Sequence, residues 1–291
     1  MSWAGGRAPA GSLFLLKAIY TDRSDPLAAQ GSTPELEGAQ ASAPTANPTL
    51  VAIFSDIHGN APALRAALAD AIGRGATQLY NLGDSVGEAP FPNETIGLLI
   101  QYGVISIRGN FDRNVIAFEE RIEHVRRRKH PARVAAIEFT AAEITPENRR
   151  YLAQLPPRRQ VSVGVVSLLL CHGSPRRDNE AVFANTPAER LAEYASMTDA
   201  HVIAVGHTHL PFVRQAAGRL FVNPGSTGRP ARDPRACYAM LHVSSDGPGH
   251  AHVRAEIIRV VYPIAEVVEA ISRYGLPEEL KAIFLKGQAL P

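Results

Sequence analysis

The sequence predicts an α/β fold in which two stacked β-sheets form a sandwich flanked by helices. Two observations support this prediction. In the first half of the chain, short apolar runs alternate with helical patterns, and in the second half the runs lie closer together, which indicates a second sheet. The expected strands are Val51–Phe54, Gln78–Leu82, Val104–Ile107, Val165–Leu170, His201–Val205, Leu220–Val222 and Tyr238–Val243.

Helical periodicity explains the segments between these strands. A helix is expected over Ala61–Ile72, because Pro62 suits a first helical turn and apolar residues recur at helical spacing. A second helix is expected over Asn93–Tyr102. The segment Asp112–Leu155 is expected to be entirely helical, and Ile264–Leu285 has the amphipathic spacing of one or two further helices.

The domain organisation follows from composition. Residues 1–48 are rich in Ala, Gly, Ser, Thr and Pro, and such a segment buries too little apolar surface to offset its ordering entropy. We therefore expect a flexible extension, followed by one folded domain over residues 49–291. This domain would contain a helical insertion at about 113–155 and a C-terminal helical segment at about 262–287.

Charge and cysteine content exclude some classes of protein. A net charge of +2 over 291 residues does not by itself indicate nucleic-acid binding. The two cysteines form no disulfide framework, which favours a reducing compartment. The apolar run Leu13–Leu16 is too short to span a bilayer. We expect a soluble cytoplasmic protein without a membrane partner and make no prediction of its oligomeric state.

Five apolar runs end in side chains that can bind metal ions, and each has a glycine close by. In chain order these side chains are Asp56 and His58, Asp84, Asn110 and Asp112, His172, and His207 and His209. Residues two apart on a strand share a face, so Asp56 and His58 are expected to project together. They would do so at the carboxyl end of the strand, where α/β folds place ligand sites.

Burying these carboxylates and imidazoles at one place would cost too much free energy without cations to neutralise them. Their mixture of oxygen and nitrogen donors suits first-row divalent ions. We therefore expect a centre with two metal ions. Mn²⁺ is the first choice, and Fe²⁺, Zn²⁺ and Ni²⁺ are alternatives.

These motifs resemble a known family. The series Asp56-x-His58, Gly83-Asp84, Gly109-Asn110-x-Asp112, His172 and Gly206-His207-x-His209 is similar to that of the calcineurin-like metallophosphoesterase superfamily, in order from about residue 50 to 243. The neighbourhoods 55–60 and 223–226 resemble its compact bacterial and archaeal phosphodiesterase-type branch. The superfamily's two-sheet sandwich with outer helices agrees with the fold predicted above.

The resemblance also implies roles for single residues. One metal ion would be held by Asp56, His58 and His209, and the other by Asn110, His172 and His207, with Asp84 bridging the two. A bridging hydroxide would then attack phosphorus in line. The counterpart of Asp112 in the superfamily supports a neighbouring catalytic histidine.

That histidine is replaced here by Phe111, which can neither donate a proton nor bind an oxyanion. Superfamily members without this histidine are often phosphodiesterases, so the resemblance implies phosphodiesters, such as cyclic nucleotides or nucleic-acid ends, as substrates in preference to monoesters. Two alternatives stay open: a phosphomonoesterase similar to Ser/Thr protein phosphatases, and an interaction scaffold that binds metal without catalysis.

Residues outside the metal set are candidates for substrate contacts. Arg108 could bind phosphate as part of the catalytic machinery, and Asn60, Phe111, Arg176 and Arg229 could line the substrate. For Asn60, capping of the helix that begins near residue 61 is an equal alternative. The basic run 126–129 could be a solvated helix face or could steer a polyanion.

Overall fold

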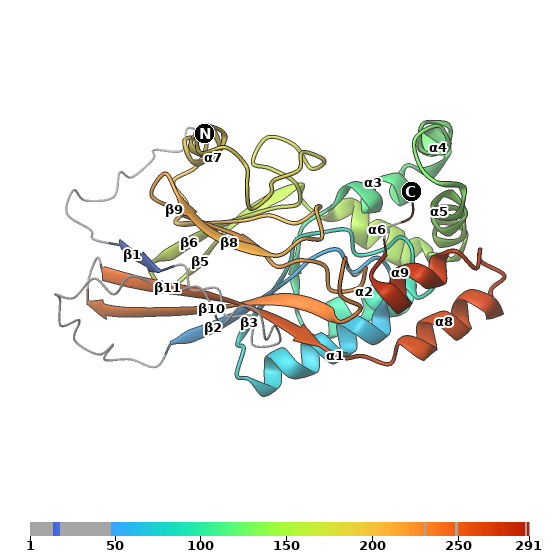
Figure 1. Cartoon of the computed structure of the whole chain (residues 1–291), viewed down its shortest axis with the longest axis horizontal. Coiled ribbons are helices and arrows are strands. Elements are labelled where there is room, and N and C mark those ends of the chain that lie inside the picture. Colours follow the sequence, from blue (N-terminus) through green and yellow to red (C-terminus); the bar gives the residue numbers. More distant parts are fainter. Residues whose placement is uncertain (1–13, 18–47, 230, 248–249, 289, 291) are drawn as a thin grey trace.

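A computed structural model describes residues 14–17, 48–229, 231–247, 250–288 and 290 (Figure 1). The flexible extension expected over residues 1–48 lies outside the described residues, apart from Pro48 and Phe14–Lys17. The segment Phe14–Lys17 forms strand β1, which pairs in parallel with β11 (His250–Val260).

The described strands form two mixed sheets. The first has the order β1, β11, β10 (Ala236–Gly247), β2 (Thr49–Phe54), β3 (Gln78–Asn81) and β4 (Ile105–Ser106). The second has the order β5 (Arg158–Val163), β6 (Val166–Cys171), β7 (Val202–Ala204), β9 (Arg219–Asn223) and β8 (Phe212–Ala216). Strands β2, β3 and β4 are parallel, as are β6, β7 and β9.

All seven expected strands are present, and the α/β sandwich is confirmed. Besides β1, which falls within the expected extension, the strands β5, β8 and β11 were not expected from the sequence. Each carries arginines among its apolar residues, which hides the strand pattern. Their partners in the sheets decide their conformation, because strand formation depends on cross-strand packing more than on intrinsic preference.

Alternation along the strands divides the core into layers. Val51 and Ile53 of β2 pack between the two sheets, together with Leu168 and Leu170 of β6. The neighbouring Phe54 points to the opposite face, against the helices. The two sheets therefore pack face to face, and their outer faces are left for helices to cover (Figure 1).

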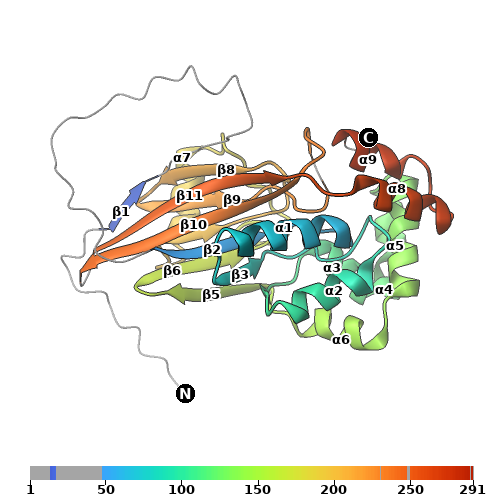
Figure 2. The ribbon, with the colours of Figure 1, turned by 90° about the horizontal axis from the view of Figure 1, so that it is seen from below.

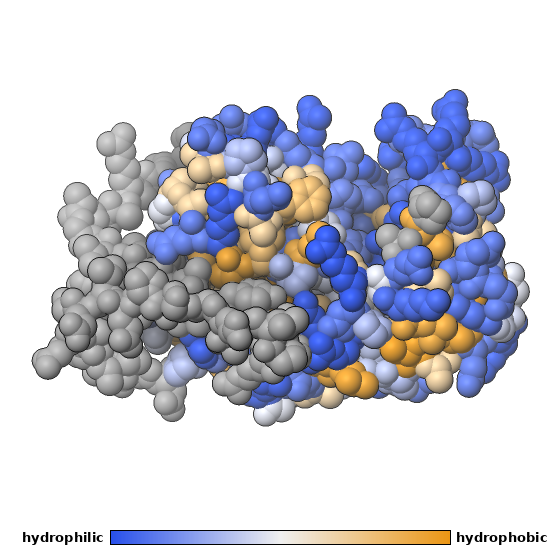
Figure 3. Space-filling model, viewed as in Figure 1, coloured by the Kyte–Doolittle hydropathy of each residue, from blue (hydrophilic) through white to orange (hydrophobic). Residues whose placement is uncertain are grey.

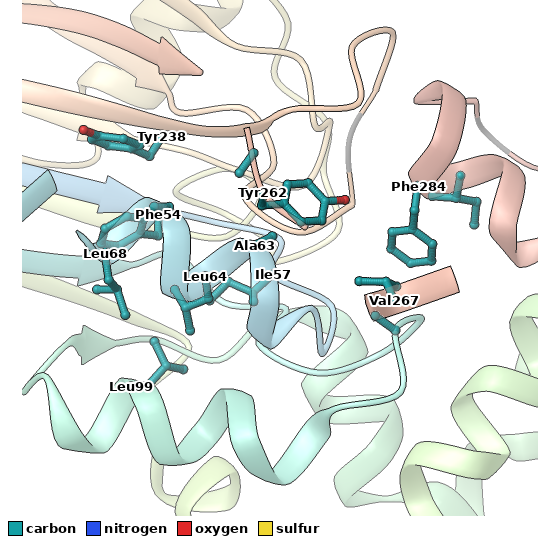
Figure 4. Close-up of a cluster of buried hydrophobic side chains, with 14 of the residues drawn as sticks. Phe54, Ile57, Ala63, Leu64, Leu68, Leu99, Tyr238, Tyr262, Val267 and Phe284 are labelled. Atoms are coloured by element: carbon teal, nitrogen blue, oxygen red, sulfur yellow. The ribbon is translucent and has the colours of Figure 1, made fainter. Parts of the chain in front are cut away.

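The outer face of the first sheet is covered by α1 (Ala61–Gly73) and α2 (Pro92–Gln101), and α8 (Ile264–Arg273) and α9 (Leu280–Lys286) extend the same apolar cluster at one end of the sheet. Figure 4 shows Leu64 and Leu68 of α1 between the sheet and the neighbouring helices, with Val267 and Phe284 closing the cluster. The outer face of the second sheet is covered by α7 (Ala188–Ala195), a helix that was not expected.

The predicted helical segment is present as four helices, which gather with α8 and α9 at one end of the sandwich (Figure 2). They are α3 (Asn110–Ile116), α4 (Phe118–Arg126), α5 (Pro131–Glu143) and α6 (Pro146–Gln154), and they share an apolar cluster with Phe111. Nowhere in the described part of the chain does a helix have the length and apolar character needed to cross a membrane.

Candidate metal centre

Three of the predicted metal ligands form a first group at the ends of β2 and β7. The Nε2 atom of His209 lies 3.2 Å from Oδ1 of Asp56 and 3.4 Å from Nε2 of His58. His58 Nε2 lies 3.8 Å from the same carboxylate oxygen. One ligand atom from each residue can therefore reach a common ion, and all three residues are buried.

A second group surrounds His172. Its Nε2 atom lies 3.3 Å from Oδ2 of Asp84, 3.2 Å from Oδ1 of Asn110 and 4.0 Å from Oδ1 of Asp56. The same Oδ2 atom of Asp84 is 3.7 Å from Nε2 of His58, in the first group. Asp84 thus lies between the two groups, as its predicted bridging role requires, and Asp56 also faces both.

His207 lies beside the second group, at its rim. Its ring centroid is 5.3 Å from that of His172, and its side chain is partly exposed. Burial and the charge of His172 lower the pKa of His207, which keeps its imidazole neutral and its nitrogen lone pair available.

Hydrogen bonds fix the orientation of two imidazoles. His172 donates from Nδ1 to the carbonyl oxygen of Leu82 at 2.8 Å, and His209 donates from Nδ1 to that of Arg229 at 2.9 Å. In each ring the Nε2 lone pair then faces the centre, which is the usual arrangement of a metal-binding histidine.

The donor set fits metal ions. Oδ1 of Asp56 is buried and has no hydrogen-bond partner among the described residues. A buried carboxylate oxygen without a donor is costly, unless a cation binds it. Because this oxygen faces His58, His172 and His209, the geometry meets the requirements of a divalent ion.

Electrostatics make the centre attractive to cations. Burial alone would raise the pKa of Asp56, but the neighbouring imidazoles, led by His209, hold this pKa well below its usual value. Burial would likewise lower the pKa of His172, but Asp84 raises it to about 10. The carboxylates therefore stay ionised. They favour a positive charge at His172, which can be a proton on the imidazole or a metal ion bound to it.

The backbone places the ligands in a way that the sequence prediction missed. Strand β2 ends at Phe54, so Asp56 and His58 lie in the following loop with φ values of 53° and 51°. The expectation that strand alternation aligns them is wrong. Asp84, His207 and His209 also have positive φ, from 52° to 66°. Such strain in side-chain-bearing residues persists only where the surrounding structure enforces it, and it concentrates at functional sites.

Glycines allow the loops beneath the ligands to approach closely, in agreement with the glycine that the sequence has near each group of candidate ligands. A Cβ atom on Gly109 would lie 2.2 Å from both the backbone nitrogen and Oδ1 of Asp84. One on Gly206 would lie 2.1 Å from Oγ of Ser55. Neither position has room for a side chain, so both glycines allow neighbouring loops to meet beneath the ligands.

Asn110 and Asp112 belong to the first turn of α3, not to the end of a strand. The Asp112 carboxylate accepts hydrogen bonds from the backbone nitrogens of Gly109 at 2.9 Å and Val86 at 3.2 Å. Burial, followed by the charge of Asp84, raises the pKa of Asp112 to about 7. Asp112 therefore joins two loops, and its oxygens are not directed toward a catalytic side chain.

The structure gives Asn60 the capping role. Its Oδ1 accepts from the backbone nitrogen of Ala63 in α1, and its Nδ2 donates to the carbonyl oxygen of Gly228 and the hydroxyl of Tyr262. The side chain is fully buried, so its polar atoms already have protein partners. We do not retain Asn60 as a substrate contact.

Two of the predicted arginines line one hollow of about 510 Å³. Arg108 lies two residues before the Asn110 ligand. Arg176 lies on the loop that follows His172 and pairs with Glu180. Three more arginines line the same hollow, Arg113, Arg158 and Arg177. Asp178 also lines the hollow and pairs with Arg113, so the wall has a net positive charge, which is suited to anionic groups.

A buried ion-pair cluster beside the centre escaped the sequence analysis. Glu88 is fully buried and binds both Arg133 of α5 and Arg229. Burial would raise the pKa of Glu88, but these two guanidinium groups hold it far below its usual value. Arg229, predicted to contact substrate, is therefore already engaged by a carboxylate. No sequence signal separates Glu88 from an ordinary loop acid, because its partners lie 45 and 141 residues away.

Comparisons with known proteins identify relatives that cover most of the chain. An uncharacterized protein of Methanocaldococcus jannaschii is 30% identical over 251 residues, which are 80% of this chain and 96% of that protein. A crystal structure of a metallophosphoesterase from Sphaerobacter thermophilus covers 83% of this chain and 100% of its own, with 29% identity and a TM-score of 0.66. A hypothetical protein of Pyrococcus horikoshii, with 24% identity over the same shares and a TM-score of 0.72, shares the fold.

The family is established by the sequence profile of the calcineurin-like phosphoesterase superfamily domain, which matches residues 50–246. This range contains β3, β4, β6, β7 and β9, nearly all of β2, and all of the residues of the candidate metal centre. The chain therefore belongs to the calcineurin-like phosphoesterase superfamily.

Proposed function

We propose that the protein hydrolyses phosphodiesters with two divalent metal ions, of which Mn²⁺ is the first choice. Asp56, His58 and His209 would hold one ion. Asn110, His172 and His207 would hold the other, and Asp84 would bind both. The observation that carries the proposal is the convergence of buried donors on the unpartnered Oδ1 atom of Asp56.

Two bound ions would lower the pKa of a water molecule that they hold. They would also supply positive charge to the phosphoryl oxygens. The protein contributes the fixed geometry of their ligands, held by strained loops and by the His172–Leu82 and His209–Arg229 hydrogen bonds. No protein nucleophile is required.

The substrate preference rests on the surroundings of the centre. Phe111 occupies the position next to Asn110, and its apolar ring offers no hydrogen-bond donor of its own to a doubly charged monoester. Arg108 and Arg176 line the neighbouring hollow and would bind further phosphate oxygens, for which Arg176 would exchange its pairing with Glu180. A diester of a nucleotide or nucleic-acid end fits both features, because its scissile phosphate has a single charge and its remainder can present other anionic groups.

The test begins with protein stripped by EDTA and reloaded with Mn²⁺, Fe²⁺, Zn²⁺ or Ni²⁺ in turn. Hydrolysis of bis-para-nitrophenyl phosphate is compared with that of para-nitrophenyl phosphate. We expect metal-dependent turnover, with the diester preferred. A preference for the monoester would contradict the diesterase proposal, and turnover of neither ester with any of these ions would leave the metal-binding scaffold as the better interpretation.

A matched pair of histidine variants connects turnover with the centre. His58→Asn removes a buried ligand, whereas His124→Asn alters an exposed histidine of α4. Loss of a direct ligand should lower metal affinity at least about 10- to 100-fold, the range found for residues that only support ligands. Equal metal affinity of the two variants by calorimetry would contradict the assigned site.

A further inference from the structure

Phe111 separates a metal ligand from a lysine. Its ring meets the His58 ring edge-on, with centroids 4.7 Å apart and an interplanar angle of 89°. On the same phenyl ring, Nζ of Lys129 lies 4.0 Å from the centroid. The ammonium group of Lys129 is thus one aromatic ring away from the first group of ligands.

Lys129 differs from the rest of its basic run. Arg126, Arg127 and Arg128 are exposed, and Arg126 pairs with Glu123 and Glu138. Figure 3 shows a hydrophilic surface over α4, the helix that ends at Arg126. The solvated-face interpretation of the run therefore holds for the three arginines. Lys129, in the connection from α4 to α5, is partly buried and turns inward onto Phe111.

The ammonium of Lys129 is available for another partner. Among the residues that the structure describes, no carboxylate lies within ion-pair distance of its Nζ, and the nearby Glu88 is engaged by Arg133 and Arg229. The face of Phe111 attracts the cation without accepting a proton from it. A flexible lysine stem can then move the ammonium between the ring and a bound substrate.

The charges around Lys129 favour its use as an acid. Burial, followed by the charge of Arg133, lowers the pKa of Lys129 to about 8, and Arg229 acts in the same direction. Glu88 and Asp84 oppose this shift. A proton donor works best when its pKa is near the operating pH, and this group meets that condition in the neutral range.

We propose that Lys129 is a catalytic residue, the proton donor to the leaving oxygen of the substrate, in the place where Phe111 offers none. The inference rests on the proposed phosphodiesterase function. As the bond from phosphorus to the leaving oxygen breaks, that oxygen keeps the bonding electron pair and takes a proton from Nζ. The attacking oxygen of water forms the new bond to phosphorus at the same time. The products are a phosphomonoester, an alcohol and a neutral amine, and the proton released by the attacking water restores the ammonium.

The test compares two methyl aryl phosphodiesters with the Mn²⁺-loaded enzyme. One carries a para-nitrophenyl leaving group, which needs no proton, and the other an unsubstituted phenyl group, whose phenol has a pKa of about 10, like tyrosine. The variants are Lys129→Met, which keeps the apolar stem, and Lys129→Arg, which keeps the charge. Arg128→Met, in the same turn but exposed, is the matched control.

For Lys129→Met we expect a loss of kcat of roughly 100-fold with the phenyl ester, the scale of general acid catalysis, and little change with the nitrophenyl ester. Lys129→Arg should show the same loss of kcat with the phenyl ester, because a guanidinium group does not release its proton near neutral pH. Arg128→Met should match the wild type with both esters, and all variants should keep the wild-type gain in Tm on adding Mn²⁺.

The proposal is overturned if Lys129→Met slows the hydrolysis of both esters equally, or of neither, while the variant keeps the Mn²⁺-induced gain in Tm. Full activity of Lys129→Arg on the phenyl ester would also overturn it, since charge alone would then suffice. If the wild-type enzyme hydrolyses neither ester, the proposed function itself is refuted, and so is the proton-donor role of Lys129 that rests on it.

Discussion

Replacing Asp84 by Asn tests the metal centre at the atom that its two halves share. In the native protein, Oδ2 of Asp84 lies 3.3 Å from His172 Nε2 and 3.7 Å from His58 Nε2. Its Oδ1 atom accepts a hydrogen bond of 2.7 Å from the backbone nitrogen of Phe111. An asparagine can keep the Oδ1 contact and so the local backbone. It replaces the shared oxygen by an NH₂ group, which has no lone pair for a cation.

The size of the effect follows from the linkage between binding and folding. An ion present at 100 times its dissociation constant stabilises the folded state by about 2.7 kcal/mol. For a folded part of this size, 1 kcal/mol corresponds to about 2–4 °C in Tm, so each occupied site should raise Tm by about 5–10 °C. In Asp84→Asn both sites lose a ligand, and most of this gain should disappear.

The assay records Tm by scanning fluorimetry with EDTA and with Mn²⁺, beside turnover of the diester. Asp84→Asn should show little Tm gain and at least about a 100-fold loss of turnover, the upper end for residues that only support ligands. Asp199→Asn, which alters an exposed carboxylate, controls for the charge change and should behave like the wild type. A full Tm gain or half of the wild-type turnover in Asp84→Asn would refute the shared-ligand role.

Three further predictions follow from close contacts. Phe111→His should leave monoester turnover within about 3-fold of the wild type, measured with para-nitrophenyl phosphate, well below the gain of a working general acid. The reason is that the backbone nitrogens of Gly109 and Val86 hold the Asp112 carboxylate in a fixed orientation between two loops, and a large gain would show that Asp112 can still orient the new ring. Gly109→Ala should lower stability by about 1–3 kcal/mol in urea titrations and weaken Mn²⁺ binding, since its Cβ would lie 2.2 Å from two atoms of the neighbouring loop. Gly97→Ala, where nothing lies within 4 Å, is its control and should be neutral or stabilising. Burial raises the pKa of Cys171 to about 12, so a thiol reagent at pH 8 should react with this free thiol only after unfolding; rapid labelling of the native protein would contradict its burial.

Much of the fold could be predicted from the sequence, because periodicity and turn residues act locally. The runs around Val51–Phe54 and Ala61–Ile72 correspond to β2 and α1 almost residue for residue. Strand β11 could not be predicted in this way. Its arginines and acidic residue lie among the apolar ones, and long pairings with β10 and β1 give it its conformation.

The metal donors could also be identified from the sequence, since each is a polar residue at the end of an apolar run. How they meet could not be predicted. Asp56 and His58 come together through left-handed loop conformations, which the contacts of Gly109 and Gly206 beneath the ligands make possible. Lys129 was hidden for a different reason. Charge in a basic run predicts solvent exposure, and only the tertiary position of Phe111 distinguishes this lysine from its arginine neighbours.

Phe111 and Lys129 are best understood as a pair. A histidine at position 111 would need an acceptor for its second ring nitrogen, and Asp112, the nearest carboxylate in sequence, already binds the backbone nitrogens of Gly109 and Val86. A phenyl ring needs no such partner and offers its face to a cation. The absence of an acid at position 111 and the inward turn of Lys129, in the connection from α4 to α5, are then one arrangement, in which the ring positions the donor and the lysine supplies the proton.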